Sequence, residues 1–350
     1  MAIAILHSFT CTSCNPNDTK VPLAEAPFTI GQDATNPHFI TFTAESTEPD
    51  ASFEWIFPQE VKVSGMRSAV FYFEKQGTYE VTLNQIVGGK KGSSTQKITL
   101  LTNSYYYTQN EQLWWNDEFT APKLDITSWN YDQGTGKWGN NEWQNYTNKP
   151  DNSFIRNGML VIKAIKSGIG QKEGDYTSAR LTTKGKKEIS AGRVEVRARL
   201  AGGRGLWPAI WFFGTKAAPN YSELDIMEYV GCDKNIIYGA VHTSATLEST
   251  EKVSSSLTVP GVEDNFHIYG MNWTRDKIEY YLDTPDNIYL TFSPSDKSNP
   301  RVWPFNSELY LILNIAVGGD WGGMKGVDDT IFPREMEIDY VRIFTRKDSK

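Results

Sequence analysis

The stretch that decides the fold alternates between charged and apolar residues without a break: Arg193-Val194-Glu195-Val196-Arg197-Ala198-Arg199-Leu200. Successive side chains of a β-strand point to opposite faces, so this period of two predicts a strand with one buried and one solvated face. No long window of the sequence shows the 3.6-residue period of an amphipathic helix. We therefore predict an all-β protein.

Strand-length apolar runs lie on both sides of this stretch. Residues 159–165 and 310–315 are almost wholly apolar, and pairs such as Asn157-Gly158 and Gly318-Gly319 supply turns. A chain of 350 residues is long enough for two domains. Strands and turns continuing to the C-terminus predict one large β-sandwich.

The first part of the chain reads as a separate unit. Short alternating runs within residues 27–103, punctuated by glycines, predict a small β-sandwich. A polar, tyrosine-rich stretch at residues 102–108 marks the boundary, so we divide the chain into a leader (1–26), an accessory domain (27–103) and a large domain (104–350). Ten of the 11 Trp follow this boundary, and their flat faces suit the apolar faces of rings.

Composition excludes several classes of function. A net charge of −7 and a pI near 5.3 argue against a nucleic-acid partner. No run approaches the roughly 18 apolar residues that a membrane-spanning helix needs. Four His and three Cys leave little material for a zinc site or a Ser-His-Asp triad, although the counts alone exclude neither.

The N-terminal residues raise a question of targeting. A short apolar run at residues 3–6 precedes Thr12-Ser13-Cys14, without the basic start of a signal peptide. The ending resembles a bacterial lipoprotein signal, which implies a lipid on Cys14. The alternative is a leader whose cysteines have no role. We expect a secreted or cell-surface bacterial protein, with an outer-membrane lipoprotein as the specific case.

The segment with the most chemical content is Tyr221-Ser222-Glu223-Leu224-Asp225-Ile226-Met227-Glu228. On a strand, Glu223 and Asp225 share one face, and strict alternation sends Glu228 to the other. A β-bulge at Ile226-Met227 would return Glu228 to the face of the other two acids. Like charges on one face repel each other and raise a pKa, and such a cost suggests a function.

The spacing of the two glutamates suits glycoside hydrolysis. With one residue taken up by the bulge, their backbones lie about 13 Å apart, from roughly 3.3 Å per residue. Two extended side chains leaning together can reach the separation of about 5 Å found in retaining glycosidases. A solvated acidic edge strand is the alternative, and for acids alternating with Leu and Ile alone it is the simpler interpretation.

The segment from Glu223 to Glu228 resembles the bulged signature of glycoside hydrolase family 16, the laminarinase-type endo-β-glucanases. The resemblance extends over about residues 113–345 and includes six further ordered blocks, at residues 138–144, 176–180, 205–211, 240–243, 314–319 and 332–341. It implies a catalytic β-jelly-roll sandwich with a substrate cleft on its concave face. The preceding small immunoglobulin-like β-sandwich resembles polycystic-kidney-disease-type modules, through Trp55 and residues 77–83, but lacks their aspartate-rich turn.

The family resemblance also implies roles for individual residues. Glu223 matches the nucleophile, Asp225 its assisting acid and Glu228 the general acid/base. Seven positions match sugar-binding sites: Asn141, Arg180, Trp207, Trp211, His242, Trp138 and Trp321. Core packing is the alternative for Trp207 and Trp211. A surface salt bridge is the alternative for Arg180, and a structural role for His242.

The family often carries a structural calcium ion on the convex face, and no cofactor is implied for catalysis. The matching calcium ligands are Glu118, the carbonyl of Gly158 and Asp339. Two carboxylates and a carbonyl oxygen, completed by waters, suit a hard cation. The predicted calcium site would stabilise the fold and take no part in cleavage.

The sequence and the resemblance together predict retaining endo-hydrolysis of β-1,3-glucan or mixed-linkage β-1,3/1,4-glucan by a monomer. One alternative is a family member that acts on a marine galactan such as agar, porphyran or carrageenan. Sulfated substrates would need several cationic side chains, and the matched blocks offer mainly Arg180. Another alternative is a non-catalytic carbohydrate-binding protein, which would not need the three acids. A purely structural module leaves the concentration of Trp unexplained.

Overall fold

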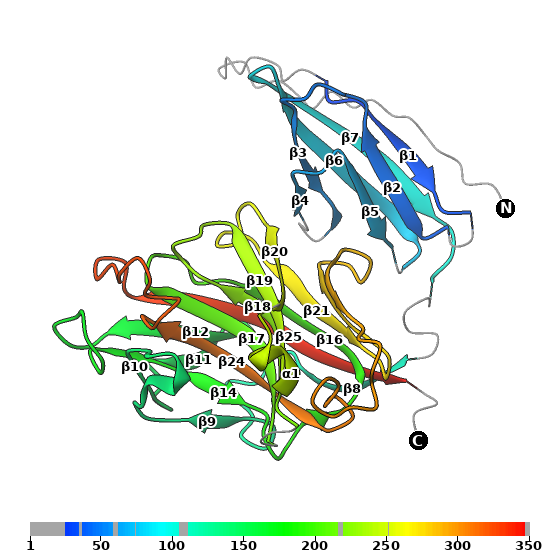
Figure 1. Cartoon of the computed structure of the whole chain (residues 1–350). Helices are drawn as coiled ribbons and strands as arrows, with labels where there is room; N and C mark the ends of the chain where they lie inside the picture. Colours follow the sequence, from blue (N-terminus) through cyan, green and yellow to red (C-terminus); the bar gives the residue numbers. More distant parts are fainter. Residues whose placement is uncertain are drawn as a thin grey trace. The chain divides into compact units, whose positions relative to one another are not determined.

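The computed structural model describes residues 25–34, 37–58, 62–73, 75–104, 111–215, 220–250 and 252–346. The chain divides into two compact units, with the division after Gln109 (Figure 1). The predicted leader cysteines, Cys11 and Cys14, lie outside the described residues. Within the described ranges, no helix is long and apolar enough to cross a membrane.

The first unit consists of two small antiparallel sheets around one core. Trp55 is fully buried in this core, and its indole N–H donates to the carbonyl of Met66. The three-stranded sheet has the order β1-β2-β5 and the four-stranded sheet the order β4-β3-β6-β7. The strands are β1 (Phe28–Gln32), β2 (Phe39–Ala44), β3 (Ser52–Ile56), β4 (Lys62–Ser64), β5 (Ser68–Tyr72), β6 (Gly77–Val87) and β7 (Lys90–Leu100). The predicted small sandwich is present, and its assignment to a particular immunoglobulin-like family stays a prediction.

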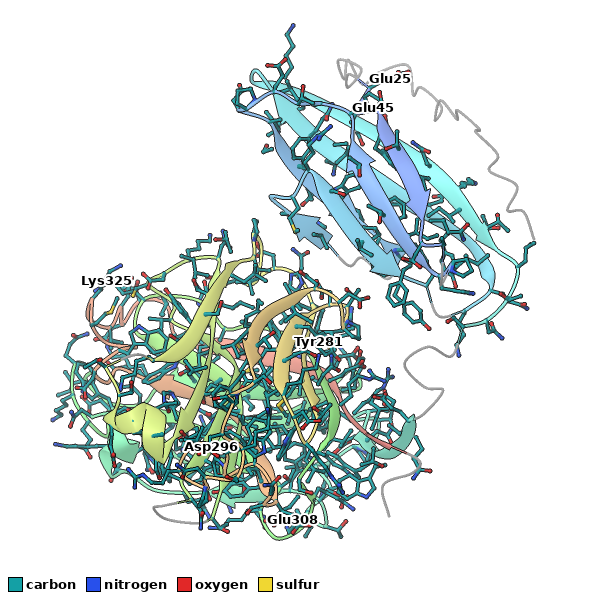
Figure 2. The ribbon with its side chains drawn as sticks, turned by 45° about the vertical axis from the view of Figure 1, so that its right-hand side comes forward. Glu25, Glu45, Tyr281, Asp296, Glu308 and Lys325 are labelled. Carbon is teal, nitrogen blue, oxygen red and sulfur yellow. The ribbon has the colours of Figure 1, made fainter. Side chains whose placement is uncertain are left out.

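The second unit consists of two large sheets that share one hydrophobic core (Figures 1 and 2). The ten-stranded sheet has the order β10-β13-β12-β25-β16-β21-β22-β23, with β11 on β12 and β8 on β25. Its strands are β8 (Glu111–Asp117), β10 (Gln144–Tyr146), β11 (Ser153–Arg156), β12 (Met159–Lys166), β13 (Tyr176–Ser178), β16 (Gly192–Arg199), β21 (His267–Trp273), β22 (Ile278–Leu282), β23 (Ile288–Phe292) and β25 (Arg334–Arg346).

The eight-stranded sheet has the order β20-β19-β18-β17-β24-β14-β9, with β15 on β24. Its strands are β9 (Asn130–Asp132), β14 (Arg180–Thr182), β15 (Glu188–Ile189), β17 (Leu206–Gly214), β18 (Ser222–Tyr229), β19 (Ile236–Thr243), β20 (Val253–Thr258) and β24 (Leu309–Val317). A five-residue helix, α1 (Ser244–Glu248), follows β19, and a 3₁₀ helix spans Lys137–Gly139.

The predicted strand at Arg193 and the predicted turn at Asn157-Gly158 are both confirmed in this unit. The alternating stretch that begins at Arg193 forms β16, and Val194, Val196 and Ala198 lie in the core. The β11–β12 hairpin turns at Asn157-Gly158 between the paired residues Arg156 and Met159. Both turn residues have positive φ, 54° and 73°, which the mirror-image hairpin turn requires and which Asn and Gly adopt most readily.

Candidate active site

Strand β18 contains the predicted bulge. Against β17, Met227 pairs with Ile210 and Asp225 with Trp211, so Ile226 has no partner of its own. Against β19 the register also shifts between Asp225 and Glu228. Ile226 and Met227 are fully buried in the core, and Glu223, Asp225 and Glu228 all face one cleft. The bulge thereby places on one face three acids that regular alternation would separate.

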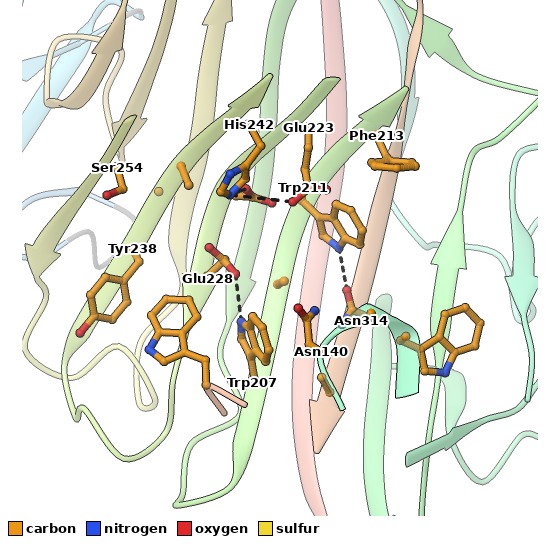
Figure 3. A pocket seen from close by; sticks show the side chains of 18 of the residues that line it. Asn140, Trp207, Trp211, Phe213, Glu223, Glu228, Tyr238, His242, Ser254 and Asn314 are labelled. Atoms are coloured by element: carbon orange, nitrogen blue, oxygen red, sulfur yellow. Dashed lines mark hydrogen bonds and ion pairs between the residues drawn. The ribbon is translucent and has the colours of Figure 1, made fainter. Parts of the chain in front are cut away.

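The cleft lies on the face of the eight-stranded sheet that is turned away from the core, and it has a volume of about 860 Å³ (Figure 3). Strand β17 forms much of its floor by simple alternation: Trp207, Ala209, Trp211 and Phe213 line it, whereas Leu206, Ile210 and Phe212 lie in the core. One face of β17 therefore presents aromatic surface beside the acids of β18.

The acids are crowded and poorly neutralised. Burial, followed by the negative charge of Glu223, raises the pKa of Asp225 well above its usual range. Burial, followed by the charges of Asp225 and Glu223, does the same to the pKa of Glu228. The shift in the pKa of Glu228 is in the direction that a general acid needs, because it favours the protonated form.

His242 is the basic group nearest to Glu223 and Asp225. Its Nε2 atom lies 3.3 Å from Asp225 Oδ2 and 3.9 Å from Glu223 Oε1. The approach to Asp225 lacks hydrogen-bond geometry, since Asp225 Oδ2 is buried with no hydrogen-bond partner in the described part of the chain. Ligand atoms of the three residues lie within 4.8 Å of one another, a spacing that a metal ion could also use. Burial and the neighbouring Glu223 carboxylate, which raise the pKa of Asp225, disfavour its charged form.

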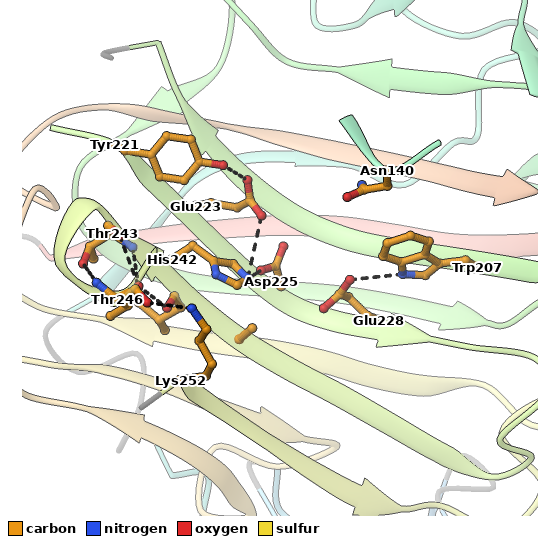
Figure 4. Close-up of polar contacts among 12 residues, drawn as sticks. Asn140, Trp207, Tyr221, Glu223, Asp225, Glu228, His242, Thr243, Thr246 and Lys252 are labelled. Carbon is orange, nitrogen blue, oxygen red and sulfur yellow. Dashed lines mark hydrogen bonds and ion pairs between the residues drawn. The ribbon is translucent and has the colours of Figure 1, made fainter. Parts of the chain in front are cut away.

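Different donors hold the two glutamates (Figure 4). The Tyr221 hydroxyl donates to Glu223 Oε2 over 2.6 Å, and the Trp207 indole N–H donates to Glu228 Oε1 over 3.0 Å. Each carboxylate thus keeps its other oxygen for a different interaction. The two glutamates have distinct environments although they are of the same residue type.

The predicted aromatic residues line the cleft. Trp207 and Trp211 lie outside the core cluster, so the core-packing alternative is wrong for both. Trp321 meets Trp207 edge to face at 5.3 Å, and the Trp211 indole N–H donates to Asn314 Oδ1 over 2.8 Å. Flat rings fixed in this way suit stacking against sugar faces.

Arg180 and His242 also line the cleft. The Arg180 guanidinium lies 4.8 Å from the ring centre of Trp211 and 5.0 Å from that of Trp138, and its Nε donates to Asp132. The salt bridge that was the alternative for Arg180 is therefore present, but it lies within the cleft wall. The Arg180 guanidinium also contacts the ring of Trp138 in this wall.

Asn141, a predicted sugar contact, pairs with another residue of the protein. Its amide donates to both carboxylate oxygens of Asp320, at 2.9 and 3.0 Å, and it does not line the cleft. Asn141 has a φ of 55°, in the left-handed region, just after the 3₁₀ helix. This turn directs Asn140 and Glu142 into the cleft wall instead.

Sequence reasoning missed several residues of the cleft. Glu142 is buried, accepts hydrogen bonds from Gln144 and Asn140, and has a pKa raised by burial. The alternation of β17 could have identified Phe213, and Tyr221, two residues before Glu223, could have been placed on the face of Glu223 in the same way. Nothing local to the sequence marks the cleft residues Tyr238 and Asn314, because other strands bring them there.

The predicted calcium ligands meet, but their carboxylates already have partners. The registers Leu160↔Ile338 and Asp117↔Val341 bring Gly158, Glu118 and Asp339 to one edge of β25. Both oxygens of Glu118 accept from Arg342 at 2.8 Å, and Asp339 accepts from Arg197 at 2.7 Å. As arranged, these residues do not fit an open cation site, because Glu118 would first have to release Arg342.

Known proteins match this unit in both sequence and structure. A β-glucanase of Rhodothermus marinus is 41% identical over 247 residues, which make up 67% of this chain and 85% of the relative. A laminarinase of Flavobacterium sp. superposes with a TM-score of 0.61 at 39% identity, covering 67% of this chain and all of that structure. The laminarinase catalytic domain of Thermotoga maritima gives a TM-score of 0.62 at 36% identity, covering 69% and 100%.

These likenesses confirm the predicted β-jelly-roll and the predicted family. Residues 140–342, which include the bulged acidic strand and most of the cleft wall, match the sequence profile of the glycosyl hydrolases of family 16. With the acids in place on β18 and the aromatic floor beside them, the chain belongs to glycoside hydrolase family 16.

Proposed function

We propose that the cleft hydrolyses β-1,3-glucan or mixed-linkage β-1,3/1,4-glucan within the chain, with retention of configuration. The observation that carries this proposal is the asymmetry of the two glutamates. Glu228 has a raised pKa and a tryptophan donor, and Glu223 accepts a hydrogen bond from a tyrosine on the same cleft face. A retaining mechanism needs one carboxyl group that gives a proton and one that attacks.

In the first step, Glu223 is the nucleophile. Its free oxygen forms a bond to the anomeric carbon, while the bond from that carbon to the leaving sugar oxygen breaks. Glu228 donates its proton to that oxygen. The Trp207 indole N–H donates a hydrogen bond to Glu228 Oε1, so Trp207 orients the acid and offers a ring face beside the cleaved bond.

In the second step, water replaces the leaving sugar. Glu228, now ionised, takes a proton from the water as its oxygen attacks the anomeric carbon. The bond to Glu223 breaks, and its electron pair returns to the carboxylate. Asp225 lies buried beside both glutamates, and before the first step its charge, with that of Glu223, raises the pKa of Glu228. His242 lines the cleft close to Asp225 and donates to sugar hydroxyls.

A neutral glucan is the substrate class that the cleft favours. The cationic side chains in its wall are engaged elsewhere: Arg180 with Asp132, and Lys252 with the carbonyls of Thr246 and Leu247. A sulfated galactan would require free cations for its sulfates. The relatives named laminarinase and β-glucanase support the same choice.

Parallel digestion of laminarin, barley mixed-linkage glucan and κ-carrageenan tests the proposal, with reducing ends and product lengths as the readout. We expect short oligosaccharides from the glucans and none from carrageenan. Cleavage of carrageenan alone would overturn the substrate. No cleavage of any of the three, together with binding to laminarin, would favour the non-catalytic alternative.

We also propose that the enzyme acts outside the cytoplasm, because its substrate is a polymer, and that it acts as a monomer. Attachment through a lipid on Cys14 is the specific form of this proposal. Fatty-acid labelling of the full chain should mark the wild type and not Cys14→Ala. Equal labelling of both proteins would contradict it. Sedimentation of the full chain checks the oligomeric state.

A further inference from the structure

Tyr221 precedes the acidic strand and touches the site from outside the acid trio. Its hydroxyl donates to Glu223 Oε2 over 2.6 Å, on the side of Glu223 away from His242 (Figure 4). His242 approaches the other oxygen, Oε1, at 3.9 Å. The two oxygens of the proposed nucleophile are therefore distinguished by their neighbours, and Oε1 is the one without the tyrosine bond.

The position of the Tyr221 ring is fixed by packing. It meets Phe213 edge to face at 5.6 Å, and Phe213 pairs in register with Glu223 across β17 and β18. Phe213 in turn packs edge to face on Trp211 and Tyr310. The hydroxyl is thus delivered to the carboxylate by a rigid aromatic cluster, which is what a preorganised donor requires.

The phenol also keeps its proton. Burial, followed by the charge of Glu223, raises the pKa of Tyr221 above its ordinary value. The group therefore acts as a hydrogen-bond donor at every pH at which the enzyme would work, and does not itself exchange a proton with substrate.

We propose that Tyr221 is a positioning residue that speeds the second step of the reaction by stabilising Glu223 as a leaving group. This inference rests on the proposed retaining mechanism. When Glu223 attacks, its carboxylate loses negative charge, so the bond from Tyr221 weakens. When water displaces it, the electron pair returns to the carboxylate and the bond strengthens. A donor at Oε2 therefore favours release of the glycosyl group over its formation.

Tyr221→Phe tests this inference, because it keeps the ring against Phe213 and removes only the hydroxyl. With dinitrophenyl β-laminaribioside the first step is fast, so kcat reports the second step and kcat/KM the first. We expect kcat to fall about tenfold or more and kcat/KM to change by less than about threefold. Intact-protein mass spectrometry should then find the glycosyl-enzyme accumulating during turnover.

Tyr131→Phe is the matched control. It removes a hydroxyl that shares a 2.8 Å hydrogen bond with Ser153, away from the cleft, and should leave both kinetic constants unchanged. Equal losses in kcat and kcat/KM for Tyr221→Phe, or no change in either, would overturn the inference while wild-type cleavage still upheld the proposed function. An inactive wild type would instead count against the function itself.

Discussion

Two strands of the catalytic unit carry three acids each among aliphatic residues, in very different surroundings. Strand β18 carries Glu223, Asp225 and Glu228, and strand β25 carries Glu335, Glu337 and Asp339. On β25 each acid meets a cation: Arg156 bridges Glu335 and Glu337, Arg199 joins Glu337, and Arg197 holds Asp339. On β18 a histidine is the nearest basic group to Glu223 and Asp225, and Glu228 has an indole donor.

The pKa shifts of the acids differ between the two strands because arginine and lysine side chains pair with the acids of β25. Burial opposes ionisation of Glu335, but hydrogen bonds from Arg156 and Lys163 prevail and lower its pKa. On β18 burial and like charges act together and raise the pKa values of Asp225 and Glu228. The comparison teaches that acids alternating along a strand do not identify a site. The neighbouring strands decide whether they brace the fold or remain available for chemistry.

The sharpest test of this comparison substitutes one acid on each strand. Glu223→Gln should lower kcat on laminarin by about 10⁴-fold or more, because an amide keeps the shape but cannot form the covalent intermediate. Glu337→Gln should leave kcat within about twofold. It should instead cost about 1–3 kcal/mol of stability through its two arginines, seen as a lower melting temperature. Near-normal activity of Glu223→Gln would contradict the assignment of β18 as the strand that carries the catalytic acids.

A second test asks whether Glu228 acts through its proton. Glu228→Gln should lower kcat/KM on laminarin by about 10²- to 10⁴-fold. On a dinitrophenyl glycoside, whose leaving group needs no proton, the first step should be nearly normal. Single-turnover release of dinitrophenol measures it. Equal losses on both substrates would show that Glu228 supplies something other than a proton.

The pH dependence of stability should have opposite signs on the two strands. Asp225 has a raised pKa in the folded state, so its ionisation destabilises the fold as pH rises. Asp225→Asn should therefore melt a few degrees above the wild type at pH 7. Glu335 has a lowered pKa, so its contribution is present at neutral pH and is lost on acidification. Glu335→Gln should melt below the wild type at pH 7.

The difference in melting temperature between each variant and the wild type should narrow towards about pH 4, where the carboxyl groups become protonated in the unfolded chain. Thermal unfolding of the three proteins across this range provides the measurement. A difference for Asp225→Asn that widens on acidification would mean that Asp225 is stabilised as an anion.

The smallest effect concerns calcium at the edge of β25. Because Arg342 holds both oxygens of Glu118 and Arg197 holds Asp339, calcium must displace ion pairs that already stabilise the fold. We expect millimolar calcium to raise the melting temperature by less than about 2 °C relative to chelator. Glu118→Gln should abolish even this increment. A rise of about 5 °C or more would show that the carboxylates prefer the metal to arginine.

Sequence reasoning reached the bulge, the acid trio and most of the aromatic floor, since these depend on the period of a strand and its interruption. It gave no role to Tyr221 or Asn140, and it predicted a sugar contact at Asn141, which pairs with Asp320. The positions of Asn140 and Asn141 depend on a turn with positive φ at Asn141, which alternation does not predict. Alternation does place Tyr221 on the face of Glu223, and only its hydrogen bond and its packing on Phe213 required the structure. The arginine partners of β25 were equally invisible, because Arg156, Arg197 and Arg199 come from other strands.

Because β18 is bulged, the common face of the three acids depends on the number of residues between them as well as on their identity. Between Asp225 and Glu228 the chain has one residue more than alternation allows. Loss of the Met227 codon would remove the extra residue and leave the three acids on one face by plain alternation. An in-frame loss of the Leu224 codon would instead keep all three acids in the protein and put Glu223 on the face opposite to Asp225. A lineage could lose catalysis by one such deletion while a residue-by-residue inventory of its acids stayed complete. Homologues should therefore be compared by spacing before they are compared by identity.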